Sequence, residues 1–197
     1  MEVILGIAIL ILSVVIHEVA HGYAAAYLGD PTARLAGRLT LNPLSHLDPM
    51  GSVIIPLITW VSGGFIFGWA KPVPYNPYNL KHGKWGEAFV AGAGPLSNFL
   101  IAFIFGLLIR FGVFGEAMVS VFTLIVITNI ALGIFNLIPI PPLDGSKILF
   151  AFLPYHYSRV RFFLEQYGFI LVLIFVLFLW NILEPLIRIL FRLFTGI

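Results

Sequence analysis

Apolar runs that approach the length of a membrane span recur along this chain, and they constrain its fold more than any other feature. They cover residues 3–16, 52–67, 88–109, 117–138 and 169–183. A transmembrane helix needs about 20 predominantly apolar residues, and the first run continues past Ala20. The chain is 60% hydrophobic and only 10% charged, whereas a soluble domain carries about 25% charged residues. We therefore expect an all-α polytopic membrane protein in which four of these runs cross the lipid bilayer.

The segments between the apolar runs are short. The longest, residues 17–51, has 35 residues, which is too little for an additional soluble domain. We expect residues 1–197 to form a single membrane-embedded domain, with a core over about 3–150 and a C-terminal helical segment over about 160–197. The chain has no cysteine and a net charge of +2 without a dense basic cluster. These features exclude disulfides and thiolate metal sites and argue against nucleic acid as a partner.

The run at 52–67 is short for a span and contains Pro56 and a Gly63-Gly64 pair. Basic residues flank it on both sides: Arg34, Arg38, Lys71, Lys81 and Lys84. The positive-inside rule places both flanks in the cytosol, which favours a re-entrant dip over a full crossing. The runs at 88–109 and 117–138 then leave the cytosol and return to it.

The run at 169–183 supplies an additional C-terminal transmembrane helix. Residues 186–194 either extend that helix or lie on the membrane surface, because Arg188 and Arg192 are four residues apart and suit an interfacial helix face.

A weak period-two pattern lies between the first two runs. In residues 34–41, Arg38 and Thr40 alternate with Leu39 and Leu41. The pattern predicts a short strand, which either offers a free edge to an extended substrate or forms a simple β-hairpin at the membrane surface.

The first run contains His17-Glu18-Val19-Ala20-His21. Two histidines at i and i+4 project from one helix face and can bind one metal ion, with Glu18 placed as a general base. Ionisable residues inside an apolar helix cost about a few kcal/mol each and are functional by default. The alternative is that the histidines bond to neighbouring helices while Glu18 pairs with a cation, but no Lys or Arg lies inside another span. The motif predicts a catalytic zinc site.

A catalytic zinc usually takes three protein ligands, so a third is required. Asp144 is the best candidate, because it lies near the end of a proline-rich segment, 136–145, that follows an apolar helix. Non-helical backbone at membrane depth is tolerated only where it is buried in protein or lines a cavity. If Asp144 instead lies in a surface turn, His46 or Asp48 becomes the third ligand.

Two asparagines lie in or at the end of apolar helices, and buried amides in a bilayer need hydrogen-bond partners. Asn98 and Asn136 are candidates for binding the substrate backbone or the developing oxyanion. The alternative for both is hydrogen bonding between helices. We expect Gly92 and Gly94 to allow close helix packing.

Together these motifs closely resemble those of the site-2 protease family of intramembrane metalloproteases. Residues 17–22, HEVAHG, are similar to the family's zinc motif, and 136–145, ending in Leu-Asp-Gly, to its second motif. Residues 94–98 resemble the Gly-Pro-x-x-Asn segment of its middle core helix. The resemblance covers about residues 3–150 and implies a three-helix catalytic core.

The resemblance also implies roles for individual residues. His17, His21 and Asp144 would bind Zn²⁺, Glu18 would be the catalytic carboxylate, and the active site would open toward the cytoplasm. The chain would sit in the cell membrane and cleave single-span membrane proteins in or near their transmembrane segments. It lacks the PDZ and nucleotide-sensing CBS domains of better-known members and looks like a minimal member, with no sequence signal for an oligomeric state.

Two other functions use the same residues. A metal transporter or channel would conduct an ion through the His and Asp side chains, but transporters often contain repeated halves with broken helices, and no such repeat is present. A non-catalytic binder of membrane helices would not need an intact His-Glu-x-x-His. The position of Glu18 between the two histidines favours chemistry.

Overall fold

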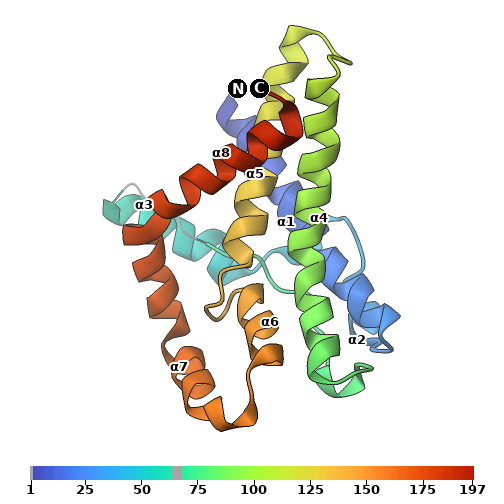
Figure 1. Cartoon of the computed structure of the whole chain (residues 1–197), viewed down its shortest axis with the longest axis vertical. Helices are drawn as coiled ribbons and strands as arrows, with labels where there is room; N and C mark the ends of the chain where they lie inside the picture. Colours follow the sequence, from blue (N-terminus) through green and yellow to red (C-terminus); the bar gives the residue numbers. More distant parts are fainter. Residues whose placement is uncertain (1, 64–67) are drawn as a thin grey trace.

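The computed structural model describes residues 2–63 and 68–197, and every regular element within them is helical (Figure 1). The α-helices are α1 (Glu2–Tyr27), α2 (Thr32–Leu35), α3 (Ile55–Gly63), α4 (Lys84–Arg110), α5 (Glu116–Asn136), α6 (Asp144–Phe152), α7 (Ser158–Ile174) and α8 (Trp180–Thr195). Three 3₁₀ segments are η1 (Pro43–His46), η3 (Pro77–Asn79) and η4 (Tyr155–Tyr157), and two π-helical segments are η2 (Pro49–Ile54) and η5 (Phe175–Leu179), all among the described residues. The predicted all-α architecture is confirmed.

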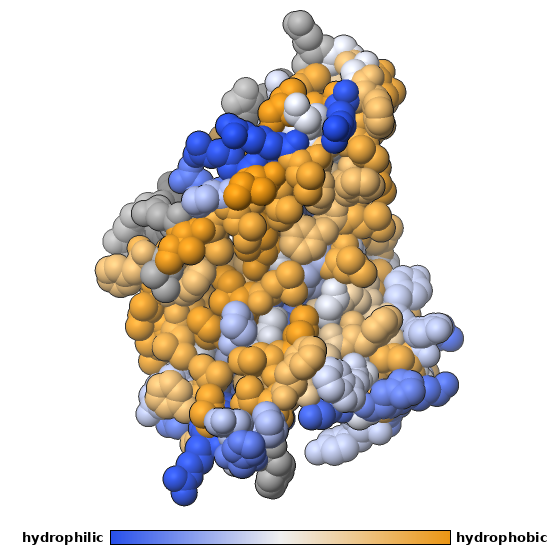
Figure 2. All heavy atoms as spheres, viewed as in Figure 1, coloured by the Kyte–Doolittle hydropathy of each residue, from blue (hydrophilic) through white to orange (hydrophobic). Residues whose placement is uncertain are grey.

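Among the described residues, four helical stretches are long and apolar enough to cross a bilayer: Val3–Tyr27, Lys84–Arg110, Met118–Asn136 and Ser158–Phe178. No more than 33% of the most apolar part of any of them is buried inside the protein. Figure 2 shows the consequence, an apolar surface across the middle of the molecule with hydrophilic atoms gathered at its lower end and along α8. A surface of this kind suits a lipid environment, because lipid tails solvate apolar side chains as well as a protein core does.

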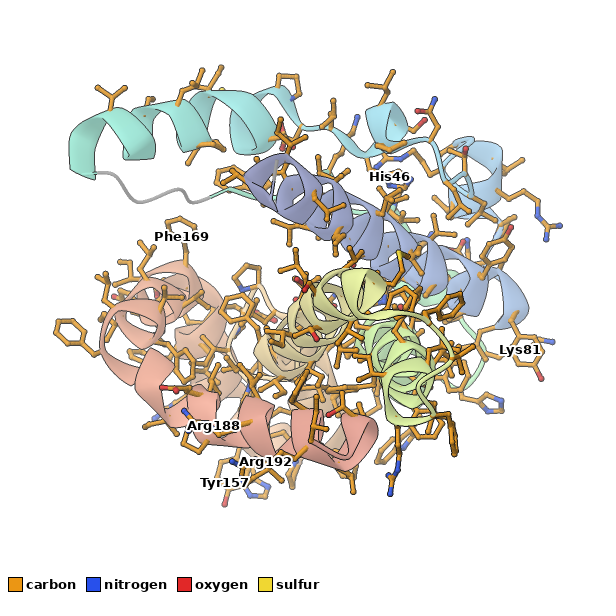
Figure 3. All side chains as sticks on the ribbon, turned by 90° about the horizontal axis from the view of Figure 1, so that it is seen from above. His46, Lys81, Tyr157, Phe169, Arg188 and Arg192 are labelled. Carbon is orange, nitrogen blue, oxygen red and sulfur yellow. The ribbon has the colours of Figure 1, made fainter. Side chains whose placement is uncertain are left out.

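Helix α4 is the centre of the bundle and packs against α1, α5, α6 and α8. Seen from above in Figure 3, α4 and α5 lie between α1 and α8. The main apolar core joins α4, α5, α7 and α8 and contains Ala102, Val126, Ile130, Ile134, Ile138, Leu143, Val172 and Leu183. A smaller core joins α1 to α4 and contains Ala24, Ala25, Leu28, Leu80 and Val90.

The end of α1 is anchored by a single carboxylate. Gly29 follows the helix with a φ of 103°, a left-handed conformation that suits glycine at a helix C-terminus. Next to it, the buried Asp30 accepts hydrogen bonds from the backbone N–H and hydroxyl of Thr32, the backbone N–H of Asn76 and the amide of Asn79. The loop after α1 and the segment before α4 are therefore fixed to each other.

The C-terminal span begins earlier than the apolar run predicts. Helix α7 starts at Ser158, and an exposed ion pair between Arg161 and Glu165 (2.8 Å) bridges its polar first turns. The wider turns of η5 join α7 to α8, and the direction of the helix changes there (Figure 1). Residues 186–194 lie in α8, after this change of direction and beyond the membrane-length stretch that ends at Phe178, and Arg188 and Arg192 are on the outer side of α8 (Figure 3).

The strand predicted for residues 34–41 is wrong. Its first part belongs to α2 and the rest is irregular, held by side chains in place of a neighbouring strand. Nη2 of Arg38 donates to the carbonyls of Lys71 (2.8 Å) and Pro72 (3.4 Å), and Nε2 of His46 donates to the carbonyl of Thr40 (2.9 Å). A four-residue alternation is too short to outweigh such contacts.

The run at 52–67 forms η2 and α3, which together are shorter than a span of about 20 residues. The chain then comes back to where this helical segment began. The backbone N–H of Trp69 donates to the carbonyl of Gly51 (3.0 Å), and its indole Nε1 donates to Asp48 (3.0 Å). Residues 64–67, on which the turn of the predicted dip falls, lie outside the described residues, and the re-entrant path stays a prediction.

Candidate metal centre

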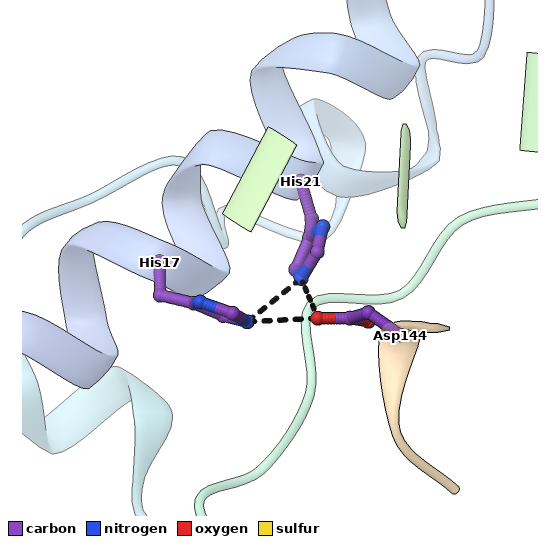
Figure 4. A group of neighbouring side chains, drawn as sticks. All are labelled: His17, His21 and Asp144. Carbon is purple, nitrogen blue, oxygen red and sulfur yellow. Dashed lines mark hydrogen bonds and ion pairs between the residues drawn. The ribbon is translucent and has the colours of Figure 1, made fainter. Parts of the chain in front are cut away.

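Three side chains from two helices meet inside the bundle (Figure 4). His17 and His21 lie one turn apart on α1, and Asp144 begins α6. Nε2 of His17 lies 3.0 Å from Nε2 of His21 and 3.0 Å from Oδ2 of Asp144. Nε2 of His21 lies 3.1 Å from the same carboxylate oxygen. All three side chains are buried, so the predicted ligands converge on one point.

Asp144 can reach the two histidines only because the next residue is Gly145. A Cβ atom at Gly145 would lie 2.1 Å from the carbonyl oxygen of Leu137, so only glycine allows the start of α6 to pack against the end of α5. The prolines between the two helices prevent α5 from continuing. The chain therefore turns back within the protein and presents the carboxylate to α1.

The outer nitrogens of both histidines are held by oxygen acceptors. Nδ1 of His17 lies 2.6 Å from Oδ1 of Asn98, and Nδ1 of His21 lies 2.7 Å from the carbonyl oxygen of Val90. Because these oxygens only accept hydrogen bonds, each Nδ1 carries the proton. In a neutral ring the Nε2 lone pair then points inward, toward the other ring and Asp144.

This donor set fits a zinc ion. Two imidazole lone pairs and a carboxylate oxygen that face one another repel unless a cation lies between them. Zinc bound tetrahedrally at about 2.0 Å separates its ligand atoms by roughly 3.3 Å, close to the observed 3.0–3.1 Å. Two histidines and one carboxylate are also a known ligand set of catalytic zinc, which leaves one position for water.

Gly94 on α4 lies directly against the two inner nitrogens. A Cβ atom there would be 2.5 Å from Nε2 of His17 and 2.5 Å from Nε2 of His21. At Gly92, by contrast, a Cβ atom would meet nothing within 4 Å. The sequence interpretation assigned both glycines to helix packing, but Gly94 leaves the space that the metal centre occupies.

Glu18 lies beside this group and is held by an extended segment, residues 71–76, that we call the strap. The backbone N–H of Val73 in the strap donates to Oε2 of Glu18 (2.8 Å). One end of the strap is fixed by Arg38 and the other by Asp30, which accepts from the backbone N–H of Asn76 (2.7 Å). No local pattern in the sequence indicates the contact with Val73, which is 55 residues away.

A second polar group lies where the strap meets α4 and α6. The hydroxyl of Tyr75 lies 3.3 Å from Oε1 of Glu87, and Nζ of Lys147 lies 5.0 Å from the centre of the Tyr75 ring. Burial raises the pKa of the Tyr75 hydroxyl, so the hydroxyl stays protonated and donates to Glu87. Lys147 is three residues after Asp144 and on the same face of α6.

The alternative third ligands lie elsewhere. The buried His46 is bonded to Thr40 and lies beside α1 on the side away from α4 (Figure 3). The carboxylate of Asp48 accepts from the backbone N–H of Met50 and from the indole of Trp69. Among the described residues, the one group able to hold a metal is that of His17, His21 and Asp144.

The two asparagines take different positions. Asn98 is fully buried. Its Oδ1 accepts a hydrogen bond from His17, and its Nδ2 donates to the carbonyl of Ser13 and to Oδ1 of Asn129. Asn98 thus forms hydrogen bonds between helices on the Nδ1 side of His17. This is the alternative that the sequence left open beside substrate binding. Asn136 is half-buried at the end of α5, where its Nδ2 donates to the carbonyl of Leu132 (3.0 Å).

Comparison with known proteins finds a peptidase family and relatives named as zinc metalloproteases, in agreement with the geometry of the metal centre. The profile of "Peptidase family M50" matches residues 112–179. The chain is 40% identical over 174 residues to "Putative zinc metalloprotease YwhC" of Bacillus subtilis, covering 84% of this chain and 76% of that protein. It is 30% identical over 175 residues to "Putative zinc metalloprotease Rip2" of Mycolicibacterium smegmatis, covering 87% and 66%.

An archaeal protein, "Zinc metalloprotease MJ0392" of Methanocaldococcus jannaschii, is 29% identical over 156 residues, covering 78% of this chain and 35% of that protein. The chain therefore spans only part of the length of each of these three relatives. No solved structure was found to match it.

Proposed function

The chain belongs to peptidase family M50, the site-2 protease family of zinc metalloproteases, and on this basis we propose that it cleaves other membrane proteins in or near their transmembrane segments. Zinc is its cofactor, and its four apolar helices make it a multi-pass membrane protein. The proposed substrates are single-span proteins of the same cell membrane.

The depth of the metal centre is the observation that carries this proposal. His17 lies about ten residues before the end of α1 at Tyr27, or roughly 15 Å along the helix axis. The hydrocarbon core of a bilayer is about 30 Å thick, so a site at this depth lies below the membrane surface. A peptide bond that reaches it must enter the membrane, and a membrane-spanning substrate is already there.

We propose that the site opens toward the cytoplasm. The metal centre is nearer to the Tyr27 end of α1 than to its start. Most of the basic residues lie between α1 and α4, at the start of α4 or in the first turn of α7: Arg34, Arg38, Lys71, Lys81, Lys84, Arg159 and Arg161. The positive-inside rule assigns such segments to the cytoplasmic side.

In the proposed mechanism, His17, His21 and Asp144 would hold a zinc ion in a buried site, and the ion would supply Lewis-acid activation of a water molecule and of the scissile carbonyl. Glu18 accepts the proton of the attacking water and passes it to the leaving amide nitrogen. The bond from Val73 to Oε2 fixes this carboxylate, and Oε1 receives no hydrogen bond from any described residue, so Oε1 is the atom that takes the proton.

The substrate helix must unwind locally, because a helix uses its own amides in internal hydrogen bonds. Asn136 stays our candidate for binding the unwound backbone or the oxyanion. Its amide nitrogen has two hydrogens, and the bond to Leu132 uses one of them. Asn98 is less suited to that role, because its amide is already bonded to protein groups on both sides.

The test is Glu18→Gln, which keeps the size of the side chain but cannot accept a proton. Wild type and variant are co-expressed with a panel of single-span proteins, and cleavage products and zinc content are measured. We expect zinc to stay and cleavage to fall by about 100-fold or more. The matched control is Glu165→Gln, the same change at an exposed residue of α7, which should cleave at the wild-type rate.

Near wild-type cleavage by Glu18→Gln would contradict the general-base assignment. If no panel member were cut by wild type while zinc crossed liposomes containing the protein, the protease function itself would be rejected.

A further inference from the structure

We propose that Asn129 is a positioning residue that sets the protonated nitrogen of His17 without touching it, through a relay of two buried amides. This inference rests on His17 being a zinc ligand, as in the proposed function. The relay joins three helices, with Ser13 and His17 on α1, Asn98 on α4 and Asn129 on α5. Asn98 and Asn129 are both fully buried, with 0% of their surface exposed.

The orientation of the Asn129 amide follows from one backbone carbonyl. Nδ2 of Asn129 lies 2.9 Å from the carbonyl oxygen of Ile125, which only accepts, so the amide nitrogen of Asn129 must face it. Nδ2 of Asn129 also lies 2.9 Å from the hydroxyl of Ser13. The amide oxygen of Asn129 is thereby turned toward Asn98.

The bond to Asn129 in turn orients the amide of Asn98 toward His17. Its Nδ2 donates to Oδ1 of Asn129 (2.9 Å) and to the carbonyl of Ser13 (3.4 Å). Its Oδ1 therefore faces His17 and accepts from Nδ1 at 2.6 Å. With the proton on Nδ1, the Nε2 lone pair is free to bind a metal. The carbonyl of Ile125, acting through two side-chain amides, and the more distant carbonyl of Ser13 thus determine which nitrogen of His17 is a ligand.

The reverse orientation of Asn98 would have the opposite effect. Its NH₂ group would then point at Nδ1 of His17 and favour the ring form protonated on Nε2, which cannot bind zinc through that atom. Without an acceptor at position 129, the shorter of the two bonds that hold the amide nitrogen of Asn98 away from His17 is lost, and the 3.4 Å bond to the carbonyl of Ser13 remains. His21 needs no relay, because its Nδ1 donates directly to the backbone carbonyl of Val90.

The test compares Asn129→Leu with Asn136→Leu. Both asparagines lie on α5, and both donate to the carbonyl four residues earlier, but Asn136 has no bond to the relay. Zinc affinity is measured by competition with a chelator on detergent-purified protein. The His17 ring form is read from ¹⁵N NMR of the zinc-free protein. Groups that orient metal ligands typically change metal affinity by about 10–100-fold.

We expect Asn129→Leu to bind zinc at least 10-fold more weakly and to lose the single Nδ1-protonated form of His17, while Asn136→Leu keeps the zinc affinity and the His17 ring form of wild type. Asn129→Asp should recover most of the affinity, because a neutral carboxyl group also accepts from Asn98 and donates to Ile125. This rescue keeps the test informative if Asn129→Leu folds poorly.

Wild-type affinity and ring form in Asn129→Leu would overturn the relay, as would an equal loss in Asn136→Leu. The ligand assignment is checked separately with His17→Ala. If that variant kept its zinc, the proposed zinc site would fail independently of the relay.

Discussion

Replacing Gly94 with alanine adds one methyl group at the most crowded point of the metal centre. The new Cβ atom would lie 2.5 Å from Nε2 of both His17 and His21, whereas ordinary contacts begin at 3.4 Å. Either the rings or α4 must therefore move by about 0.9 Å. Metal–ligand distances tolerate changes of only about 0.2 Å, so the two nitrogens and Asp144 can no longer meet at one ion.

We expect Gly94→Ala to lower zinc affinity by about 100-fold or more, or roughly 2.8 kcal/mol of binding free energy. The matched control is Gly92→Ala, the same change on the same helix, where a Cβ atom meets nothing within 4 Å. Zinc affinity is measured by chelator competition in detergent, and peptide cleavage is followed in parallel.

Because Gly94 precedes Pro95, a side chain there also strains the helix, so circular dichroism and thermal unfolding are recorded for both variants. A folded Gly94→Ala protein with the zinc affinity of Gly92→Ala would refute the argument that this glycine makes room for the metal.

Two further predictions concern the ligands and the topology. Asp144→Ala should remove most of the zinc measured by elemental analysis, since two histidines alone leave the site with too few ligands; full retention would return His46 to consideration. Single cysteines at Arg38 and Lys81, in a chain that has none of its own, should be labelled from the same side of the membrane by an impermeant thiol reagent. Opposite labelling would make the segment between them a true crossing.

Much of the metal centre could be predicted because it depends on local spacing. The interval between His17 and His21 places both side chains on one helix face in any α-helix. Their position in an apolar run makes a functional role the natural explanation. Asp144 was predictable for a related reason, because prolines and a following glycine mark the place where a membrane helix must end inside the protein.

The fold was predicted where hydropathy decides it and missed where contacts decide it. The spans were found from runs of apolar residues, because lipid solvation depends on composition alone. The start of α7 at Ser158 was missed because its first turns are polar, although the helix is continuous. The strand at 34–41 was wrong because a short alternation says nothing about the bonds that Arg38 and His46 make.

The sequence by itself thus determined a helical membrane protein with a His-Glu-x-x-His zinc motif, because helix periodicity and hydropathy act over a few neighbouring residues. The tertiary structure alone decided which groups orient the motif. The bond from His17 to Asn98 joins residues 81 apart, and that from Val73 to Glu18 joins residues 55 apart. Such pairs form only when helices pack, because buried polar groups must find partners from whichever elements lie beside them.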